Sequence, residues 1–205
     1  MSILQHTFGI LFRPTNEWQV IRKKNRNALE VFVTHIPFLA LIPTLSAYIG
    51  VTQVGWRIGD GHTVKLTASS AATLCALAYF AVVAAVYFLG VFIHWMSKTY
   101  GAEDPDQQRH YGSMALAVAV ATPVLIAGFA NLYPQLWVVV GAMGLAACYA
   151  IYLVYEGTPI LMNIPRERAY MYASSIITIG LVLIVSVMMV TTVVWGMGIG
   201  PIYTD

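Results

Sequence analysis

Residues 171–196 read MYASSIITIGLVLIVSVMMVTTVVWG and contain no aspartate, glutamate, lysine or arginine. Roughly 20 apolar residues in a helix cross a hydrocarbon core of about 30 Å, and a helix satisfies its own backbone hydrogen bonds within lipid. This stretch is long enough and apolar enough to do both. It therefore predicts a membrane-spanning α-helix.

Four other stretches have the same character. Of the 205 residues, 59% are hydrophobic and only 10% are charged, whereas soluble domains are about 25% charged. We therefore expect an all-α, polytopic membrane protein with five transmembrane helices. The other four predicted spans are about 29–52, 67–96, 111–131 and 135–156.

Residues 1–28 form a separate segment before the first span. Asn16 to Gln19 resembles a helix start, Trp18 and Ile21 share one helical face, and the next turn is basic. This pattern is typical of an amphipathic helix in the headgroup layer beside anionic lipid. A short solvated tail whose charges only set topology is the alternative. The chain thus divides into a cytoplasmic segment and a five-helix domain over 29–205.

Lysines and arginines gather on one side of the predicted bundle. Because cytoplasmic loops retain positive charge during insertion, the N-terminus is predicted in the cytoplasm and the C-terminus on the other side. Nine of the eleven basic residues are on the cytoplasmic side and two are on the other: Arg13, Arg22, Lys23, Lys24, Arg26, Lys98, Arg109, Arg166 and Arg168 against Arg57 and Lys65.

Small side chains indicate which helices pack closely, since backbones in lipid approach each other over Gly, Ala, Ser and Thr. The third predicted span carries such a stripe, which predicts a central position in the bundle: Gly112, Ala115, Ala119 and Thr122. The fourth span is expected to present a similar surface: Ala142, Gly144, Ala146 and Cys148.

Four prolines are expected to kink or interrupt the helices, because proline removes a backbone donor. They are Pro37, Pro43, Pro123 and Pro159. Discontinuous helices often line binding sites in transporters. His35 lies just before the first of these prolines. It is interpreted either as a proton or metal site or as a neutral histidine bonded to a freed carbonyl.

The loop between the first two spans runs from Gln53 to Leu66. It predicts a small hairpin that turns at Asp60-Gly61. A plain glycine-rich loop fits the same residues equally well.

No catalytic pattern accompanies the spans. Their middles lack charged residues, which argues against an ion-coupled pump, and the net charge of +2 gives no reason to expect a nucleic-acid partner. Cys75 and Cys148 lie inside spans without CxxC spacing, so both are expected to pack as small hydrophobes. His6, His94 and His110 share the predicted cytoplasmic side, but their spacing matches no metal signature. We expect no enzyme, metal or cofactor.

Three local patterns occur in order along the chain: Phe12-x-Pro14-x-x-x-Trp18 with Ile21, Tyr111-Gly112 leading to Thr122-Pro123, and Gly157-Thr158-Pro159 running through Ile164 to Arg168-Ala169. Together with five spans they resemble the Yip (Ypt-interacting protein) family, in particular its short bacterial inner-membrane branch. The resemblance implies a cytosolic N-terminus and a place in the bacterial cytoplasmic (inner) membrane. In eukaryotic members it implies Golgi or endoplasmic reticulum, Rab GTPase binding and vesicle traffic. Those members carry a long hydrophilic N-terminal region, whereas about 28 residues precede the first span here.

These observations favour a non-enzymatic integral membrane protein that organises or binds other membrane components, as a scaffold or adaptor. A small transporter or channel for a neutral or lipophilic compound is the alternative, and an enzyme using interfacial residues comes third. The expected partners are membrane lipids and either another membrane protein or a second copy of this chain. The candidate interaction residues are Tyr111, Gly112, Pro123, Gly157, Pro159, Arg166 and Arg168.

Both signs of charge gather in the predicted cytoplasmic loops. Arg166 and Arg168 are expected to hold a lipid phosphate or a partner carboxylate by charge-assisted hydrogen bonds. Gly157 and Pro159 are expected to break the fourth helix and expose carbonyl groups there. The alternative is that the two arginines only enforce topology.

Reporter fusions test the predicted orientation. Fusions after His62 and Asp205 are expected outside the cytoplasm, and fusions after Lys98 and Arg168 inside it, because of the uneven distribution of positive charge. A reporter active only in the cytoplasm, paired with one active only outside it, makes this measurement. Cytoplasmic activity of the Asp205 fusion would show that a span has been miscounted.

Overall fold

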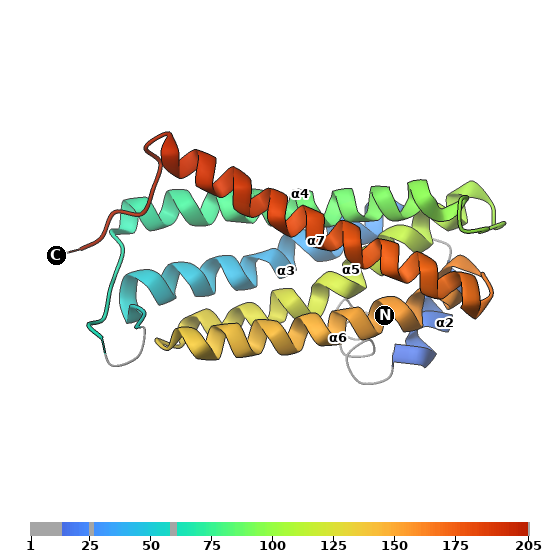
Figure 1. Cartoon of the computed structure of the whole chain (residues 1–205), viewed down its shortest axis with the longest axis horizontal. Coiled ribbons are helices and arrows are strands. Elements are labelled where there is room, and N and C mark those ends of the chain that lie inside the picture. The colour runs from blue at the N-terminus through green and yellow to red at the C-terminus, as the bar shows by residue number, and fades with distance from the viewer. Residues whose placement is uncertain (1–13, 25–26, 58–60, 205) are drawn as a thin grey trace.

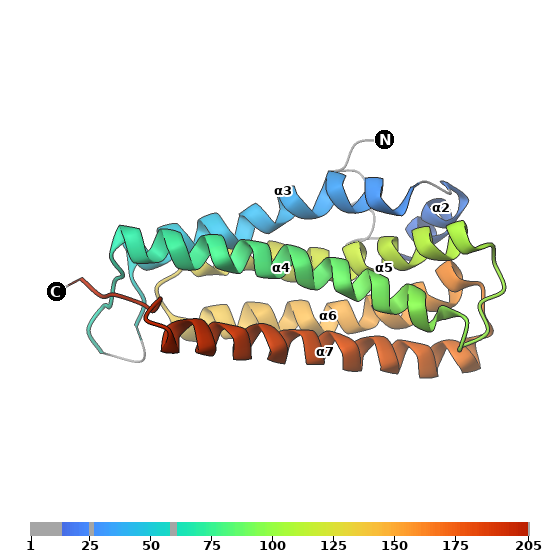
Figure 2. The same ribbon diagram turned by 90° about the horizontal axis from the view of Figure 1, so that it is seen from above.

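The computed structural model describes residues 14–24, 27–57 and 61–204. Its long helices lie side by side along the long axis of the molecule (Figures 1 and 2). Five of the described helices are long and apolar enough to cross a membrane, which confirms the predicted all-α fold. In chain order the elements are α2 (Pro14–Lys24), α3 (Ala28–Ile49), the π-helix η1 (Gly50–Val54), α4 (Ala68–Ser97), α5 (Asp106–Ala127), the 3₁₀ helix η2 (Gly128–Leu132), α6 (Leu136–Met162) and α7 (Arg166–Gly196).

The two ends of the bundle differ. We call the end that carries α2, the α4–α5 loop 98–105 and the α6–α7 turn 163–165 the basic end (Figure 1, right). Here α5, α6 and α7 each extend several residues beyond the predicted spans. The apolar pattern therefore located the spans but not these ends of the helices. The extensions of α5 and α7 are polar, and that of α6 follows Gly157 and Pro159, at which a break was predicted.

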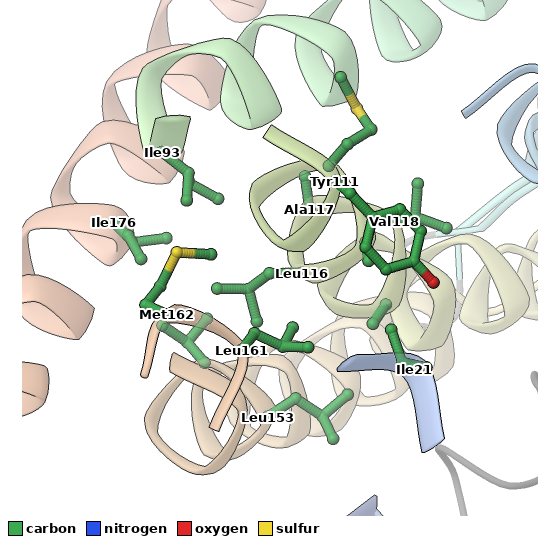
Figure 3. Packing of buried hydrophobic residues seen from close by; sticks show 14 of the residues in the cluster. Ile21, Ile93, Tyr111, Leu116, Ala117, Val118, Leu153, Leu161, Met162 and Ile176 are labelled. Atoms are coloured by element: carbon green, nitrogen blue, oxygen red, sulfur yellow. The ribbon is translucent and has the colours of Figure 1, made fainter. Parts of the chain in front are cut away.

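Helix α5 is the centre of the bundle. It contacts α3, α4 and α6, and its side chains are buried without a break from Tyr111 to Ala119. Figure 3 shows Leu116 of α5 among Leu153, Leu161 and Met162 of α6. The predicted small-residue stripe on this helix is buried along its whole length, so its central position is confirmed.

The small-residue surface predicted for α6 is only half right. Ala146 is buried and Ala142 is partly buried. Gly144 and Cys148 lie on the exposed side, and nothing would lie within 4 Å of a Cβ atom added to Gly144. Each pair has i, i+4 spacing and so shares a face, but the two pairs are offset by two residues, which places them on opposite sides of a helix. Cys148 is therefore not a packing residue.

The four prolines do not interrupt the helices, and the kinks expected at them stay a prediction. All four prolines lie inside continuous helices: Pro37 and Pro43 in α3, Pro123 in α5 and Pro159 in α6. A proline removes a single backbone donor, and the hydrogen bonds on either side of it hold the remaining turns in place.

His35 bonds within its own helix. Its Nδ1 lies 2.9 Å from the Val31 carbonyl oxygen and 2.9 Å from Thr34 Oγ1. The carbonyl that Pro37 leaves without its helical donor is that of Val33, so the bonded carbonyl is not the freed one. The freed carbonyl predicted as the acceptor is therefore wrong, and His35 instead bonds to Val31 and Thr34.

The end of the bundle opposite the basic end is joined by short backbone pairings. Trp56 and Val64 each donate an N–H to the other's carbonyl at 3.0 Å, so the loop pairs as a hairpin. Asp60 of the predicted turn lies outside the described residues. The chain beyond α7 returns to α4, where Ser70 Oγ donates to the Gly200 carbonyl at 3.0 Å.

Helix α7 is attached mainly through its first turns. It contacts α4 and α6, and its buried residues all precede Ile177: Ala169, Tyr172, Ala173 and Ile176. Most of the remaining length presents exposed apolar side chains, as expected for a helix surrounded by lipid.

Replacing Ala119 with Leu tests the central position of α5. Ala119 is 1% exposed, so the larger side chain should lower the free energy of unfolding by ~1–3 kcal/mol through overpacking. Ala147→Leu in α6 is the control, because Ala147 is exposed and the same change should be nearly neutral there. Thermal unfolding in detergent measures both. Equal stability of Ala119→Leu and the parent would contradict the assignment.

Candidate functional site

Four of the predicted interaction residues are buried between helices. Gly112 lies against α6, where an added Cβ atom would be 3.1 Å from the Leu161 carbonyl oxygen. Tyr111 and Pro123 are buried in α5, and Gly157 is buried in α6. The structure therefore shows these four buried inside the bundle, and a role in binding other molecules stays a prediction for them.

Gly157 is where α2 docks on the bundle. A Cβ atom at this position would lie 2.9 Å from the ring of Trp18 and 2.9 Å from the Leu116 side chain. Trp18 has no exposed surface and Ile21 on the same face is 7% exposed. The predicted apolar face of the N-terminal helix is thus packed against the bundle, and the described part of this segment is not a solvated tail.

A buried arginine joins α4 to α5. Arg109 is 4% exposed, and its guanidinium donates to the Asp104 carbonyl at 2.9 Å, to Ser97 Oγ at 2.8 Å and to Asp106 Oδ1 at 2.5 Å. A buried charge is costly unless it is hydrogen-bonded and paired. These contacts meet that requirement and fix the turn between the two helices.

Asp104 connects this turn to two further elements. Its carboxylate accepts from Arg22 Nη2 of α2 and from Asn163 Nδ2 at the end of α6, each at 3.3 Å. Arg22 also donates to the Ile160 carbonyl of α6 at 2.7 Å. Through its backbone and side chain, Asp104 therefore links α2, the α4–α5 loop, α5 and α6 at the basic end.

Helix α6 continues to Met162 and is capped by Asn163, so the predicted break at Gly157 and Pro159 is wrong. Asn163 has φ 53° and ψ 47°, the left-handed conformation typical of helix ends, and its N–H donates to the Pro159 carbonyl. Thr158 Oγ1 donates to the Val154 carbonyl at 2.6 Å within the helix. The chain turns three residues before α7 begins at Arg166, and this turn sets the position of the two arginines.

Two tyrosines attach the start of α7 to the end of α4. The Tyr172 hydroxyl donates to the Ile93 carbonyl. Tyr100 stacks on the Tyr172 ring with centroids 4.7 Å apart, and its hydroxyl lies 2.5 Å from Ser175 Oγ. The first turns of α7 are therefore held by both stacking and hydrogen bonds.

Arg166 and Arg168 are exposed on the first turn of α7. Neither makes a hydrogen bond or ion pair with a residue that the structure describes. A Cβ atom on Gly101 would lie 2.8 Å from Arg168 Nη1, and Gly101 has a φ of +85° that favours glycine. The structure thus brings Arg168 beside the α4–α5 loop, as the sequence predicted, and leaves its N–H donors available.

Two of the three predicted cytoplasmic histidines come together. The rings of His94 and His110 have centroids 4.8 Å apart, and His94 Nε2 lies 3.7 Å from Asp106 Oδ1. His6 lies outside the described residues. Among the residues that the structure describes, no group of three or more histidine, cysteine, aspartate or glutamate side chains is placed to hold a metal ion.

The five-helix chain is similar to known membrane proteins. A model of the Yip1 domain matches residues 8–187. The chain belongs to the Yip1 domain family. It is 33% identical over 195 residues to the inner membrane protein YohC of Escherichia coli K12, covering 95% of this chain and 98% of YohC. YohC of Escherichia coli O6:H1 matches with the same identity and coverage. No solved structure matches.

Membership of the Yip1 domain family confirms the resemblance drawn from the three local patterns. This Yip1 domain protein is therefore membrane-integral, and the relatives it matches are inner membrane proteins. Sequence reasoning missed Asp104 as the centre of the basic end. The only signal for this residue in the sequence was its position between two basic segments, in the loop that follows α4 and precedes α5.

Asp104→Asn tests the link between α2 and the bundle. The variant keeps the size of the side chain but loses its charge, and the partly exposed contact to Arg22 limits the expected loss to about 1 kcal/mol of unfolding free energy. Glu103→Gln is the matched control, since it removes one negative charge from the exposed neighbouring residue. Thermal unfolding in detergent compares them, and equal shifts for the two variants would remove the special role of Asp104.

Proposed function

We propose that this Yip1 domain protein is a non-enzymatic scaffold or adaptor of the inner membrane that binds other membrane components at its basic end. One observation carries the proposal. Arg166 and Arg168 are exposed without partners among the described residues, on a helix start that is held firmly in place. A guanidinium presents a planar fork of donors that matches a phosphate or a carboxylate.

The firm attachment of α7 supports binding by these arginines. Tyr172 and Tyr100 fix the first turns of the helix against α4. A pre-organised donor loses less conformational entropy when it meets its ligand than a donor on a mobile loop does. The ligand in this proposal is a lipid phosphate or a carboxylate of a membrane-protein partner.

The proposal includes a cytoplasmic position for the basic end. The charge asymmetry of the loops supports that orientation. Two other polar side chains at this end are occupied by structural contacts: Arg109 joins α4 to α5, and Asp104 joins α2 to α6. Such contacts favour a binding surface over a reacting site.

Transport or binding of a lipophilic compound is the second candidate, because a cavity of about 620 Å³ lies between α4 and α7. Its lining is almost entirely apolar. The hydroxyls of Ser186 and Thr191 in the lining donate to carbonyls of their own helix. An apolar molecule fits this chemistry, and cavities of roughly 300–1,000 Å³ hold small ligands. The expected helix interruptions no longer support this candidate.

Arg168→Lys tests the first proposal. Lysine keeps the positive charge but loses the planar fork, so the amount of partner or lipid that co-purifies from native membranes should fall about tenfold, as for the loss of one charge-assisted hydrogen bond. Arg57→Lys, on an exposed arginine at the opposite end, should leave it unchanged. Quantitative mass spectrometry of the purified sample measures both, together with the amount of inserted protein.

Two results separate the alternatives. If Arg168→Lys co-purifies like the parent while the Arg166/Arg168 double alanine variant merely inserts less well, the arginines only set topology and the proposal fails. Recovery of a bound small apolar molecule without a stoichiometric protein or lipid would favour the second candidate.

A further inference from the structure

A second polar site lies where α2 meets α5 and α6. It is a cavity of about 550 Å³ at the basic end. The residues that line it are Gln19, Arg22, Lys23, Gln108 and Ile160. The two arginines of the proposed function, at the start of α7, do not line it, so the two sites are separate.

Four of the five described residues that line this cavity carry hydrogen-bond donors. Gln19, Arg22 and Lys23 have i, i+3 and i+4 spacing on α2, so they share one face of that helix. Gln108 enters from the first turns of α5. A guanidinium, an ammonium group and two carboxamides all donate hydrogen bonds, and none of the described residues that line the cavity carries a carboxylate. The chemistry fits an oxyanion with several acceptor oxygens.

Arg22 is already oriented for such a ligand. One of its terminal nitrogens donates to the Ile160 carbonyl at 2.7 Å and the other to Asp104 at 3.3 Å. Its side chain is still 27% exposed, and the guanidinium has further N–H donors. Asp104 offsets one positive charge next to the cavity. Lys23 is exposed and makes no hydrogen bond or ion pair in the described part of the chain.

The depth of the cavity matches the headgroup layer of a bilayer. Gln108 precedes the apolar stretch 111–131 by three residues, and Ile160 follows the stretch 135–156 by four. At about 1.5 Å per residue, they lie roughly 4.5 and 6 Å beyond the predicted spans. Each headgroup layer is about 5–7 Å thick. A lipid phosphate occupies this depth.

We propose that this cavity binds the phosphate group of an anionic membrane phospholipid. The phosphate oxygens accept from Arg22, Lys23 and the two glutamines. The acyl chains extend along the exposed apolar side chains of α6. Because Trp18 fixes α2 on Gly157, the donors from α2 and α5 are assembled before the lipid arrives.

Native mass spectrometry of the full-length, detergent-solubilised chain tests the site. The probes are phosphatidylglycerol, zwitterionic phosphatidylcholine and inorganic phosphate, titrated separately. The parent should bind phosphatidylglycerol most tightly. Lys23→Gln should weaken that binding about fivefold, as expected for one lysine near an anionic lipid surface. Gln108→Leu keeps every charge and should weaken it about threefold through the loss of one hydrogen bond.

Lys98→Gln is the matched control, since it removes one exposed lysine from the same end of the bundle but outside the cavity. Unchanged phosphatidylglycerol binding by this variant, with the two losses above, supports the site. An equal loss of phosphatidylglycerol binding in Lys98→Gln and Lys23→Gln would show that the lipid is attracted by positive surface charge in general. That result would overturn the proposal. Inorganic phosphate that binds as tightly as the lipid would overturn the lipid assignment. Neither outcome depends on Arg166 or Arg168.

Discussion

The close approach of α5 to its neighbours is the contact on which the rest of the structure depends. Lipid tails are as apolar as leucine, so helices in a bilayer associate through tight packing. Gly112 has no side chain, so the Leu161 backbone of α6 approaches α5 closely. The small side chains of Ala115, Ala117 and Ala119 are buried where α5 contacts α3, α4 and α6. With α5 in the centre, α3, α4 and α6 form the surrounding layer. Helix α7 remains at the periphery, attached by its first turns.

The central helix also determines the geometry of the basic end. Helix α5 begins at Asp106, so the α4–α5 loop turns at the end of the packed core. Arg109 fixes that turn from inside by bonding to Ser97 and Asp106. The turn then directs the Asp104 carboxylate toward α2 and the end of α6. The buried Arg109 and the Asp104 carboxylate thus position the elements of the basic end relative to the packed helices.

The sequence predicts the spans well because hydrophobicity in lipid leaves little choice of structure. It predicts the central helix from one stripe of small residues, since that stripe stays on a single face. It failed for Gly144 and Cys148, where residues from two faces were read as one surface. It could not distinguish Arg109 from Arg168, because both are arginines beside a span. The fold buries Arg109 beside Ser97, Asp104 and Asp106, whereas it leaves Arg168 exposed.

The positive charges at the basic end therefore serve different physical roles. Charge-guided insertion depends on how many lysines and arginines lie near the spans on each side of the membrane. Folding then divides them. Arg109 is fully committed inside the protein, and Arg22 is committed in part, to Asp104 and a carbonyl. Lys23 and Arg168 keep their donors exposed. A ligand can gain charge-assisted bonds only from donors that the fold has left available, so the structural contacts of the committed residues determine where binding occurs.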